Sequence, residues 1–324
     1  MSYRAELLGI VDELKGRLPR VCGLTGRLAS LNDGMLKTWN DAAEIEYSLP
    51  TTLPPAAELL AVASDPTADP ELAARVGQEL WIVSGDLTAP AVRVAIPADG
   101  AAFLPSGRLI VTAPSEPREG ADFSESHRVI LLESTGEVVD EAVVVALDPE
   151  PHLLRHPVDA AIVCDFVMGQ DGSLLTVIRD VDGRLDVEEV LRAEDLVTLS
   201  FSPLGDQVLF GPYPSDPERA VVATWPGLAI DSTLDAESLE LETGFDITGG
   251  HLADGRILLL AAETGPVVAD RDLAEAALVE MVDLDDYVGD GFVESIAPLG
   301  AETFAAVLWE AGQRTTTVWR LVAR

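Results

Sequence analysis

The sequence is poor in cysteine and contains no long apolar run. Its 324 residues include two cysteines, Cys22 and Cys164, which lie far apart. This argues against a disulfide framework and against a cysteine-based zinc site, and we interpret both residues as buried, inert thiols. No run approaches 18 uncharged apolar residues, so we predict no transmembrane helix. Acids interrupt the first twenty residues, so no signal peptide is expected and we predict a cytoplasmic protein.

Positive charge is also scarce. The 56 acidic residues outnumber the 21 basic ones and give a formal net charge of −35, and only Lys15 and Lys37 are lysines. Such a charge is typical of the surfaces of proteins from salt-adapted or high-GC organisms. It repels nucleic acids and anionic membranes. We therefore predict that the partners are a protein, a peptide or a small cationic ligand, and that they include neither nucleic acid nor membrane.

The common catalytic and cofactor motifs are absent. The sequence lacks the G-x-S-x-G nucleophile elbow, the P-loop and G-x-G-x-x-G. His152 and His156 have a metal-binding helical spacing, but prolines flank them closely and no glutamate follows the first histidine. Residues 283–294 resemble a calcium loop, except that Tyr287 and Val288 occupy positions that need an oxygen ligand and a glycine. We predict no cofactor and no metal site.

The N-terminal part of the chain has helical features. Apolar residues recur at helical spacing from Tyr3 to Leu18, and Pro19 ends the pattern. We predict a helix over residues 1–19. Helical patches are also expected near 55–63 and 70–76, within a Pro-rich insertion that spans about residues 50–76.

From Gly77 onward the pattern is that of β-structure. Apolar runs of five to eight residues alternate with turns, as in "SFSPLGDQVLFGP" at 200–212. The unit of strand, glycine turn and stronger strand recurs at spacings of 65, 33, 50 and 45 residues, close to the period of a four-stranded blade. The turn glycines are Gly107, Gly172, Gly205, Gly255 and Gly300.

These units resemble the blades of WD-repeat-like β-propellers. "FSPLGDQVLFG" is similar to the strand with a Ser-Pro-Asp-Gly turn of that family, and "TTTVWRL" is similar to the strand that closes a blade. The resemblance implies an all-β fold, which we predict as a β-propeller over residues 20–324. We count seven blades, with six as the alternative. The structural rival is a pair of β-sandwiches.

The resemblance also implies where a site would lie. In a propeller the first strand of each blade lines the channel, and that strand starts at the mouth where ligands bind. Carboxylates fall six to ten residues before the five turn glycines, and His251 lies near the end of a predicted inner strand. The carboxylates could bind a cation or raise one another's pKa, although an acidic chain places acids in most loops by chance. They are Asp99, Asp165, Asp195, Asp246 and Glu294.

Two hypotheses of function follow, with a structural subunit as a weaker third. The first is a non-catalytic binding module, which needs no catalytic motif. The second is a cofactor-independent enzyme, such as a cyclase or hydrolase of bacterial secondary metabolism, which would use Asp165, Asp246, Glu294 or His251 at the channel mouth. The five tryptophans are interpreted as core packing rather than as a ligand cage.

Overall fold

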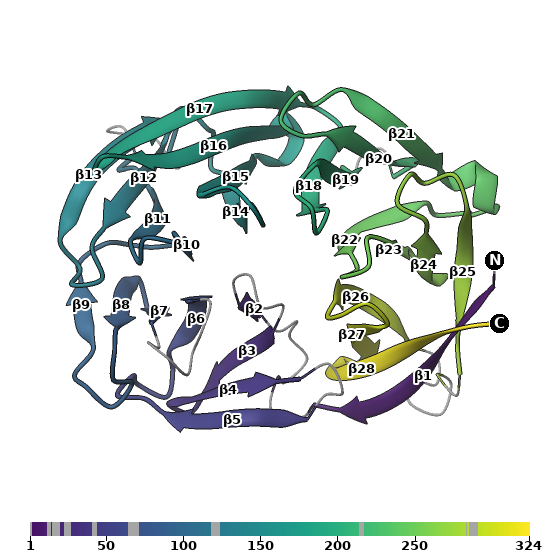
Figure 1. The fold of residues 1–324 in the computed structure, drawn as a ribbon, viewed down its shortest axis with the longest axis horizontal. Coiled ribbons are helices and arrows are strands. Elements are labelled where there is room, and N and C mark those ends of the chain that lie inside the picture. The colour runs from purple at the N-terminus through teal and green to yellow at the C-terminus, as the bar shows by residue number, and fades with distance from the viewer. Residues whose placement is uncertain are drawn as a thin grey trace. The chain divides into compact units, whose positions relative to one another are not determined.

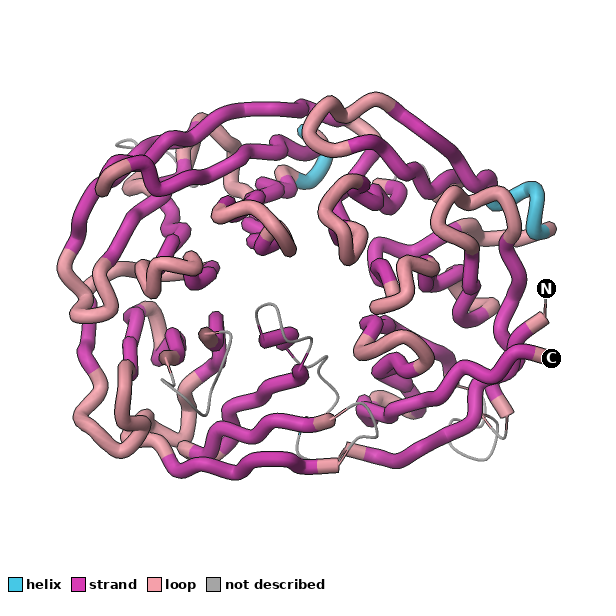
Figure 2. Tube along the Cα trace, viewed as in Figure 1, coloured by secondary structure: helices cyan, strands magenta, loops and turns pink. Residues whose placement is uncertain are grey.

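In the computed structural model the regular secondary structure of the described residues is almost wholly β-strand (Figure 1). Figure 2 shows how little helix the described part of the chain contains, namely short 3-10 turns such as Gly169–Asp171 and Ala236–Leu239. No helix in the described part of the chain is long and apolar enough to span a membrane. The structure describes residues 2–11, 14, 20–22, 27–40, 44–63, 71–117, 124–213, 217–282, 284 and 291–324.

The chain divides into two compact units. The middle unit comprises Arg20–Thr38 and Glu46–Glu194, and the terminal unit comprises Met1–Pro19, Trp39–Ile45 and Asp195–Arg324.

Four four-stranded sheets account for the strands of the middle unit. In each sheet the strands follow one another in chain order and are antiparallel to their neighbours. The first two sheets are β2 (Arg20–Cys22), β3 (Arg27–Asn32), β4 (Met35–Trp39), β5 (Ile45–Pro50), and β6 (Glu58–Val62), β7 (Leu72–Val76), β8 (Glu79–Val83), β9 (Val92–Val94). The other two are β10 (Gly100–Phe103), β11 (Leu109–Pro114), β12 (His127–Leu132), β13 (Val138–Val144), and β14 (Glu150–Arg155), β15 (Ala161–Val167), β16 (Ser173–Val181), β17 (Arg184–Ala193).

The terminal unit contains one four-stranded and one eight-stranded sheet. The eight-stranded sheet has the order β22-β23-β24-β25-β1-β28-β27-β26. By strand order it can be divided into two groups of four, and the blade count of seven or six stays a prediction. The strands are β18 (Leu196–Phe201), β19 (Gln207–Pro212), β20 (Arg219–Thr224), β21 (Ile230–Asp235), and β22 (Phe245–His251), β23 (Ile257–Ala261), β24 (Gly265–Ala269), β25 (Ala276–Met281), β26 (Phe292–Pro298), β27 (Thr303–Glu310), β28 (Gln313–Ala323) and β1 (Tyr3–Ile10).

The predicted N-terminal helix is wrong, because residues 3–10 form strand β1. This strand pairs antiparallel with β28 along its whole length and parallel with β25 from Tyr3 to Ala5. The two termini of the chain therefore lie side by side (Figure 1). Tyr3 and Ala5 are buried with Trp319 in one apolar cluster, and Leu7 packs against it. The alternation of Tyr3, Ala5 and Leu7 fits a strand, and pairing with the C-terminal strand outweighs the helical spacing.

The helical patches predicted near 55–63 and 70–76 are also wrong. Residues 58–62 and 72–76 form the antiparallel strands β6 and β7. Their apolar residues pack in a cluster with those of β3 and β4, including Leu59, Leu72 and Leu36. Burial of both strands among neighbouring strands outweighs the helix propensity of their alanines and leucines.

The second and third strands of the sheets carry most of the core. Strand β11 reads "LIVTAP", and its first five residues are buried. Strand β23 reads "ILLLA" and is buried throughout. Such unbroken apolar runs are typical of strands that are covered on both faces. The fourth strands differ, since β17 alternates between exposed charged residues and partly buried apolar ones.

Candidate functional site

The structure places four of the five predicted carboxylates at the start of the first strand of a sheet. Asp99 directly precedes β10 and Asp195 directly precedes β18. Asp246 is the second residue of β22, and Glu294 is the third residue of β26. The last three belong to the terminal unit, and Asp99 belongs to the middle unit.

Asp165 does not share this position. It lies in the second strand β15, opposite His152 of β14, and is 1% exposed. In the sequence we interpreted Gly172 as the turn between the first and the second strand of its sheet. This glycine lies instead between β15 and β16 at a φ of 80°. Gly107, Gly205 and Gly255 do lie between the first and second strands of their groups, so the interpretation was wrong for Gly172.

Three of the four strand-start carboxylates already have a partner from the third strand of their own sheet. Asp195 binds Arg219 at 2.5 Å. Glu294 accepts two hydrogen bonds from Arg314, at 2.6 and 2.5 Å. Asp99 accepts a hydrogen bond from His127 Nε2 at 2.6 Å and one from Thr112 Oγ1 at 2.7 Å. These contacts join the first strand to the third within each sheet, which is a structural role.

Asp246 is the exception, because its sheet offers no base at the corresponding place. The third strand β24 begins with Gly265 and Pro266. Within the described residues the Asp246 carboxylate accepts a hydrogen bond from the backbone N–H of Ile247, at 2.6 Å, and has no basic partner. Burial raises the pKa of Asp246, and the nearby Glu294 carboxylate raises it further, while the Ile247 N–H lowers it.

Backbone irregularities set the positions of these two acids. In β22 the register with β23 jumps from Phe245 to Gly249, so Asp246 lies in a bulged stretch. Gly249 permits it, because it has a φ of 143° and a Cβ there would lie 2.3 Å from the carbonyl oxygen of Leu258. In β26 the register shifts at Glu294. Bulges of this kind re-aim side chains next to functional sites.

An aromatic pair joins β26, the strand of Glu294, to the neighbouring strand β27. Phe292 stacks on Trp309 of β27, with ring centroids 5.4 Å apart and planes 29° apart, and Phe292 is 44% exposed. Trp309 lies opposite Arg314, the residue that binds Glu294. Ile247, beside Asp246, is also exposed. The Asp246 surface is defined here as Asp246, Ile247, Phe292, Glu294 and Trp309.

Sequence reasoning missed the aromatic pair, because all tryptophans were assigned to the core. That assignment is confirmed for Trp319 and Trp39, which are buried. Trp309 is half-buried near the end of its strand. Trp309 lies five residues before Arg314, with the turn at Ala311–Gly312 between them. This closeness to a turn indicates the end of a strand rather than the core.

His251 lies at the end of β22, as predicted, and contacts the neighbouring first strand. Its backbone N–H donates to Ser200 Oγ at 2.9 Å, and its Nδ1 lies 2.8 Å from the same oxygen. The direction of this second hydrogen bond follows the tautomer of His251, because the hydroxyl has one hydrogen to donate and two lone pairs that accept. Nε2 is buried and has no hydrogen-bond partner in the described chain. The pKa of His251 is lowered to about 4, mainly by burial and also by Arg271, while Asp206 acts to raise it.

This histidine should make the protein less stable as the pH falls. The folded-state pKa of about 4 lies below the unfolded value of about 6.5, so the unfolded chain binds more protons between these values. Stability is therefore full above about pH 6.5 and falls towards pH 4. In urea unfolding, wild type is expected to lose about 2–3 kcal/mol more than His251→Gln on going from pH 7 to pH 4.5. Identical losses in the two proteins would show that His251 is not the group that titrates.

The remaining predicted motifs show no site. His156 Nδ1 accepts the backbone N–H of Asp159 at 2.8 Å, which stabilises a turn. Cys164 is fully buried, and its burial raises the pKa of its thiol well above the ordinary value. The side chain of Cys22 and most of the calcium-loop-like segment 283–294 lie outside the described residues. Within the described ranges, no three His, Cys, Asp or Glu residues gather so that they could hold a metal ion.

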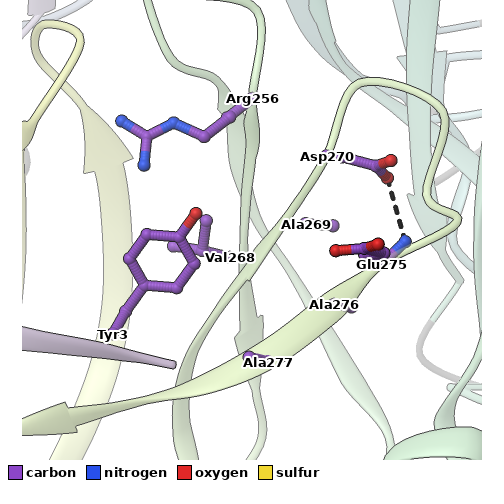
Figure 3. A pocket seen from close by; sticks show the side chains of 8 residues that line it. All are labelled: Tyr3, Arg256, Val268, Ala269, Asp270, Glu275, Ala276 and Ala277. Atoms are coloured by element: carbon purple, nitrogen blue, oxygen red, sulfur yellow. Dashed lines mark hydrogen bonds between the residues drawn. The ribbon is translucent and has the colours of Figure 1, made fainter. Parts of the chain in front are cut away.

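A small pocket lies elsewhere in the terminal unit (Figure 3). It has a volume of about 110 Å³. Arg256 at one side is hydrogen-bonded to Asp254 at 2.7 Å, to the carbonyl oxygen of Ala301 at 2.8 Å and to Tyr3. The guanidinium is thus engaged, and the pocket offers mainly aliphatic surface. Its walls are Tyr3, Arg256, Val268, Ala269, Asp270, Glu275, Ala276 and Ala277.

Comparison with known proteins shows the fold. No protein family and no curated protein matches the sequence. Among solved structures, the chain is similar to the Cps50 (Swd1) β-propeller domain of Myceliophteria thermophila, with a TM-score of 0.60, 12% identity, and coverage of 95% of this chain and 97% of that one. It is also similar to YCF48 bound to D1 peptide (0.57, 9%, 100% and 98%) and to hydrazine synthase of Kuenenia stuttgartiensis (0.60, 11%, 96% and 97%). The chain is therefore a β-propeller, which confirms the predicted fold class.

Proposed function

We propose that this protein is a non-catalytic binding propeller that takes a basic side chain of a protein or peptide partner at the Asp246 surface. The observation that carries the proposal is a half-buried carboxylate without a basic partner in the described chain, in a protein whose other strand-start carboxylates each have a hydrogen-bond donor from the third strand. An arginine or lysine from a partner would supply the missing cation.

The surroundings of Asp246 suit such a side chain. A guanidinium can hydrogen-bond a carboxylate with two parallel N–H groups and can also stack on an aromatic face. The exposed Phe292, which stacks on the half-buried Trp309, would provide the aromatic face, and Ile247 would add apolar contact. Hydrogen bonds to charged groups contribute about 1.5–3 kcal/mol, and a cation–π contact adds about 0.5–1 kcal/mol.

Charge and fold support the same class of partner. A net charge of −35 attracts basic partners over long range. The similar structure of YCF48 is described with a bound peptide, although propellers host many functions and the fold alone does not decide.

A displayed library of random twelve-residue peptides, selected on the purified protein, tests the proposal. The selected peptides are expected to share an arginine or lysine next to an apolar residue. For the best synthetic peptide, Asp246→Asn and Phe292→Ser should each weaken binding at least about tenfold in calorimetry. Binding should also weaken as the pH falls, because protonation of Asp246 removes its charge.

The matched control is Glu302→Gln, which removes one exposed negative charge elsewhere in the same unit. It should leave the affinity nearly unchanged. Selected peptides without a basic residue, or equal losses for Asp246→Asn and Glu302→Gln, would show that the Asp246 surface is not the binding site.

A cofactor-independent hydrolase is the second candidate function. The hydrogen bond between the Ser200 hydroxyl and the neutral His251 favours it, since a serine is activated by an adjacent base. Ser200 Oγ also accepts the backbone N–H of His251, a contact that suits a structural role equally well. Covalent labelling of Ser200 by a fluorophosphonate, lost in His251→Gln, would favour this candidate over the first.

A further inference from the structure

The outer strand of one sheet in the middle unit exposes a row of apolar side chains. On β13 and the residues that follow it, Val143, Val145 and Leu147 are 61%, 74% and 36% exposed. The intervening Val144 and Ala146 are buried. The end of β13 and the connection that follows it are thus apolar on both sides, although one side is open to solvent.

Other outer strands also expose apolar side chains, among them Ile230 of β21 and Val92 of β9, but β17 of the next sheet does not. On β17 the exposed residues are all charged. Proteins protect free strand edges in this way against unwanted pairing. The three exposed apolar residues at the alternate positions 143, 145 and 147 depart from that rule, and we interpret them as a contact surface for a partner. The exposed residues of β17 are Arg184, Asp186, Glu188, Glu189 and Arg192.

No strand of the described chain pairs with the outer edge of β13 from Glu141 onward. In the described chain, β13 is the last strand of its sheet and pairs with β12. The turn between β16 and β17 covers its beginning, where the N–H of Leu185 donates to Asp140 Oδ2 at 2.8 Å. That hydrogen bond and the N–H of Glu141 lower the pKa of Asp140, so this cover is held by an ionised carboxylate. An added strand could pair beyond it.

The charges around the open edge are negative. Asp148 and Glu150 are exposed and follow the apolar row directly. Glu125 is exposed beside Ser124, whose carbonyl oxygen accepts the N–H of Asp148 at 3.0 Å. The nearby Arg128 is engaged by Glu141 through two hydrogen bonds, at 2.7 and 2.8 Å. The surface therefore complements a cationic partner and repels a second copy of this acidic chain.

We propose that the edge of β13 from Glu141 to Val144, with the connection that follows it to Leu147, is a docking site for an extended segment of a partner protein that alternates apolar and basic residues. Its backbone would extend the sheet, its apolar side chains would lie against Val143, Val145 and Leu147, and its basic residues would meet the surrounding carboxylates. The site goes beyond the function proposed above, because it uses none of the residues of the Asp246 surface.

An acetylated, amidated octapeptide that alternates lysine or arginine with valine serves as the probe. Binding is measured by fluorescence anisotropy at about 0.15 M salt, where surface charge effects are largely screened. Measurements in the Asp246→Asn variant as well as in wild type separate this binding from any at the Asp246 surface. Hydrogen exchange should show new protection over residues 141–147 when the peptide is bound.

The double variant Val143→Thr/Val145→Thr keeps the β-branched shape and removes apolar surface. It should weaken binding at least about tenfold and leave the melting temperature unchanged. The matched control is Val158→Thr/Val181→Thr, which changes two exposed valines elsewhere in the same unit and should bind as wild type. A peptide of the same composition with its valines in one block, and a peptide with alternate backbone N–H groups methylated, should both bind more weakly.

Three results would overturn the proposal. One is equal binding of the alternating and block peptides, which would mean that charge alone drives the contact. Another is absence of binding, or protection elsewhere than at 141–147. The third is a dimer of the wild-type protein that the double variant abolishes, which would make a second copy the occupant.

Discussion

Removal of residues 1–10 is expected to lower the melting temperature by about 10 °C or more, or to leave the protein insoluble. Strand β1 lies inside the eight-stranded sheet, between β25 and β28. Its loss would divide that sheet and expose two strand edges, which promotes aggregation. It would also uncover the cluster that contains Trp319 and would remove the burial of Tyr3, which alone contributes about 2 kcal/mol. Differential scanning calorimetry measures the effect.

Addition of a synthetic peptide with the sequence of residues 2–11 should restore part of the lost stability, because the peptide can pair again with β28. The matched control is the same peptide with Ala5→Pro. Ala5 pairs with Leu321 on one side and with Met281 on the other, and a proline is not tolerated in such a central strand. A truncated protein that melts within about 2 °C of wild type would contradict the role assigned to β1.

The case of β1 shows what the sequence could predict and what it could not. The turns between neighbouring strands are local, so Gly107, Gly205 and Gly255 marked them correctly, and each has a positive φ. The partner of Tyr3 is Ala323, at the other end of the chain. No local pattern carries that information, and an eight-residue strand that also fits helical spacing was therefore assigned to the wrong class.

The candidate site was predictable in position but not in environment. Asp246 and Glu294 were found by their distance from the turn glycines. Whether such an acid has a basic partner depends on the third strand of its sheet. In the sheets that have one, the basic residue follows its acid by 20 to 28 residues. This spacing alone would have predicted a wrong partner for Asp246. Arg271 follows Asp246 by 25 residues, yet it binds Asp206, which belongs to another sheet.

Replacement of Asp99 by alanine is expected to destabilise the protein by about 3 kcal/mol, far more than the same change at Asp195. The Asp99 carboxylate accepts hydrogen bonds from His127 and from Thr112, both of which are buried. His127 also packs edge-on against Phe166, with ring centroids 5.6 Å apart. Without the carboxylate, a buried imidazole N–H and a buried hydroxyl lose their acceptor, and each such loss costs about 1–3 kcal/mol.

Asp195→Ala is the matched control, because Asp195 holds the same position at the start of its own sheet. Its partner Arg219 is about half exposed, and Asp195 is itself exposed at its side chain. Water can solvate both groups after the change, so the expected loss is about 0–1 kcal/mol. Urea unfolding at pH 7 measures both variants. A loss of similar size in the two would mean that burial of His127 and Thr112 does not set the strength of the contact, and that the strand-start acids act alike as surface ion pairs.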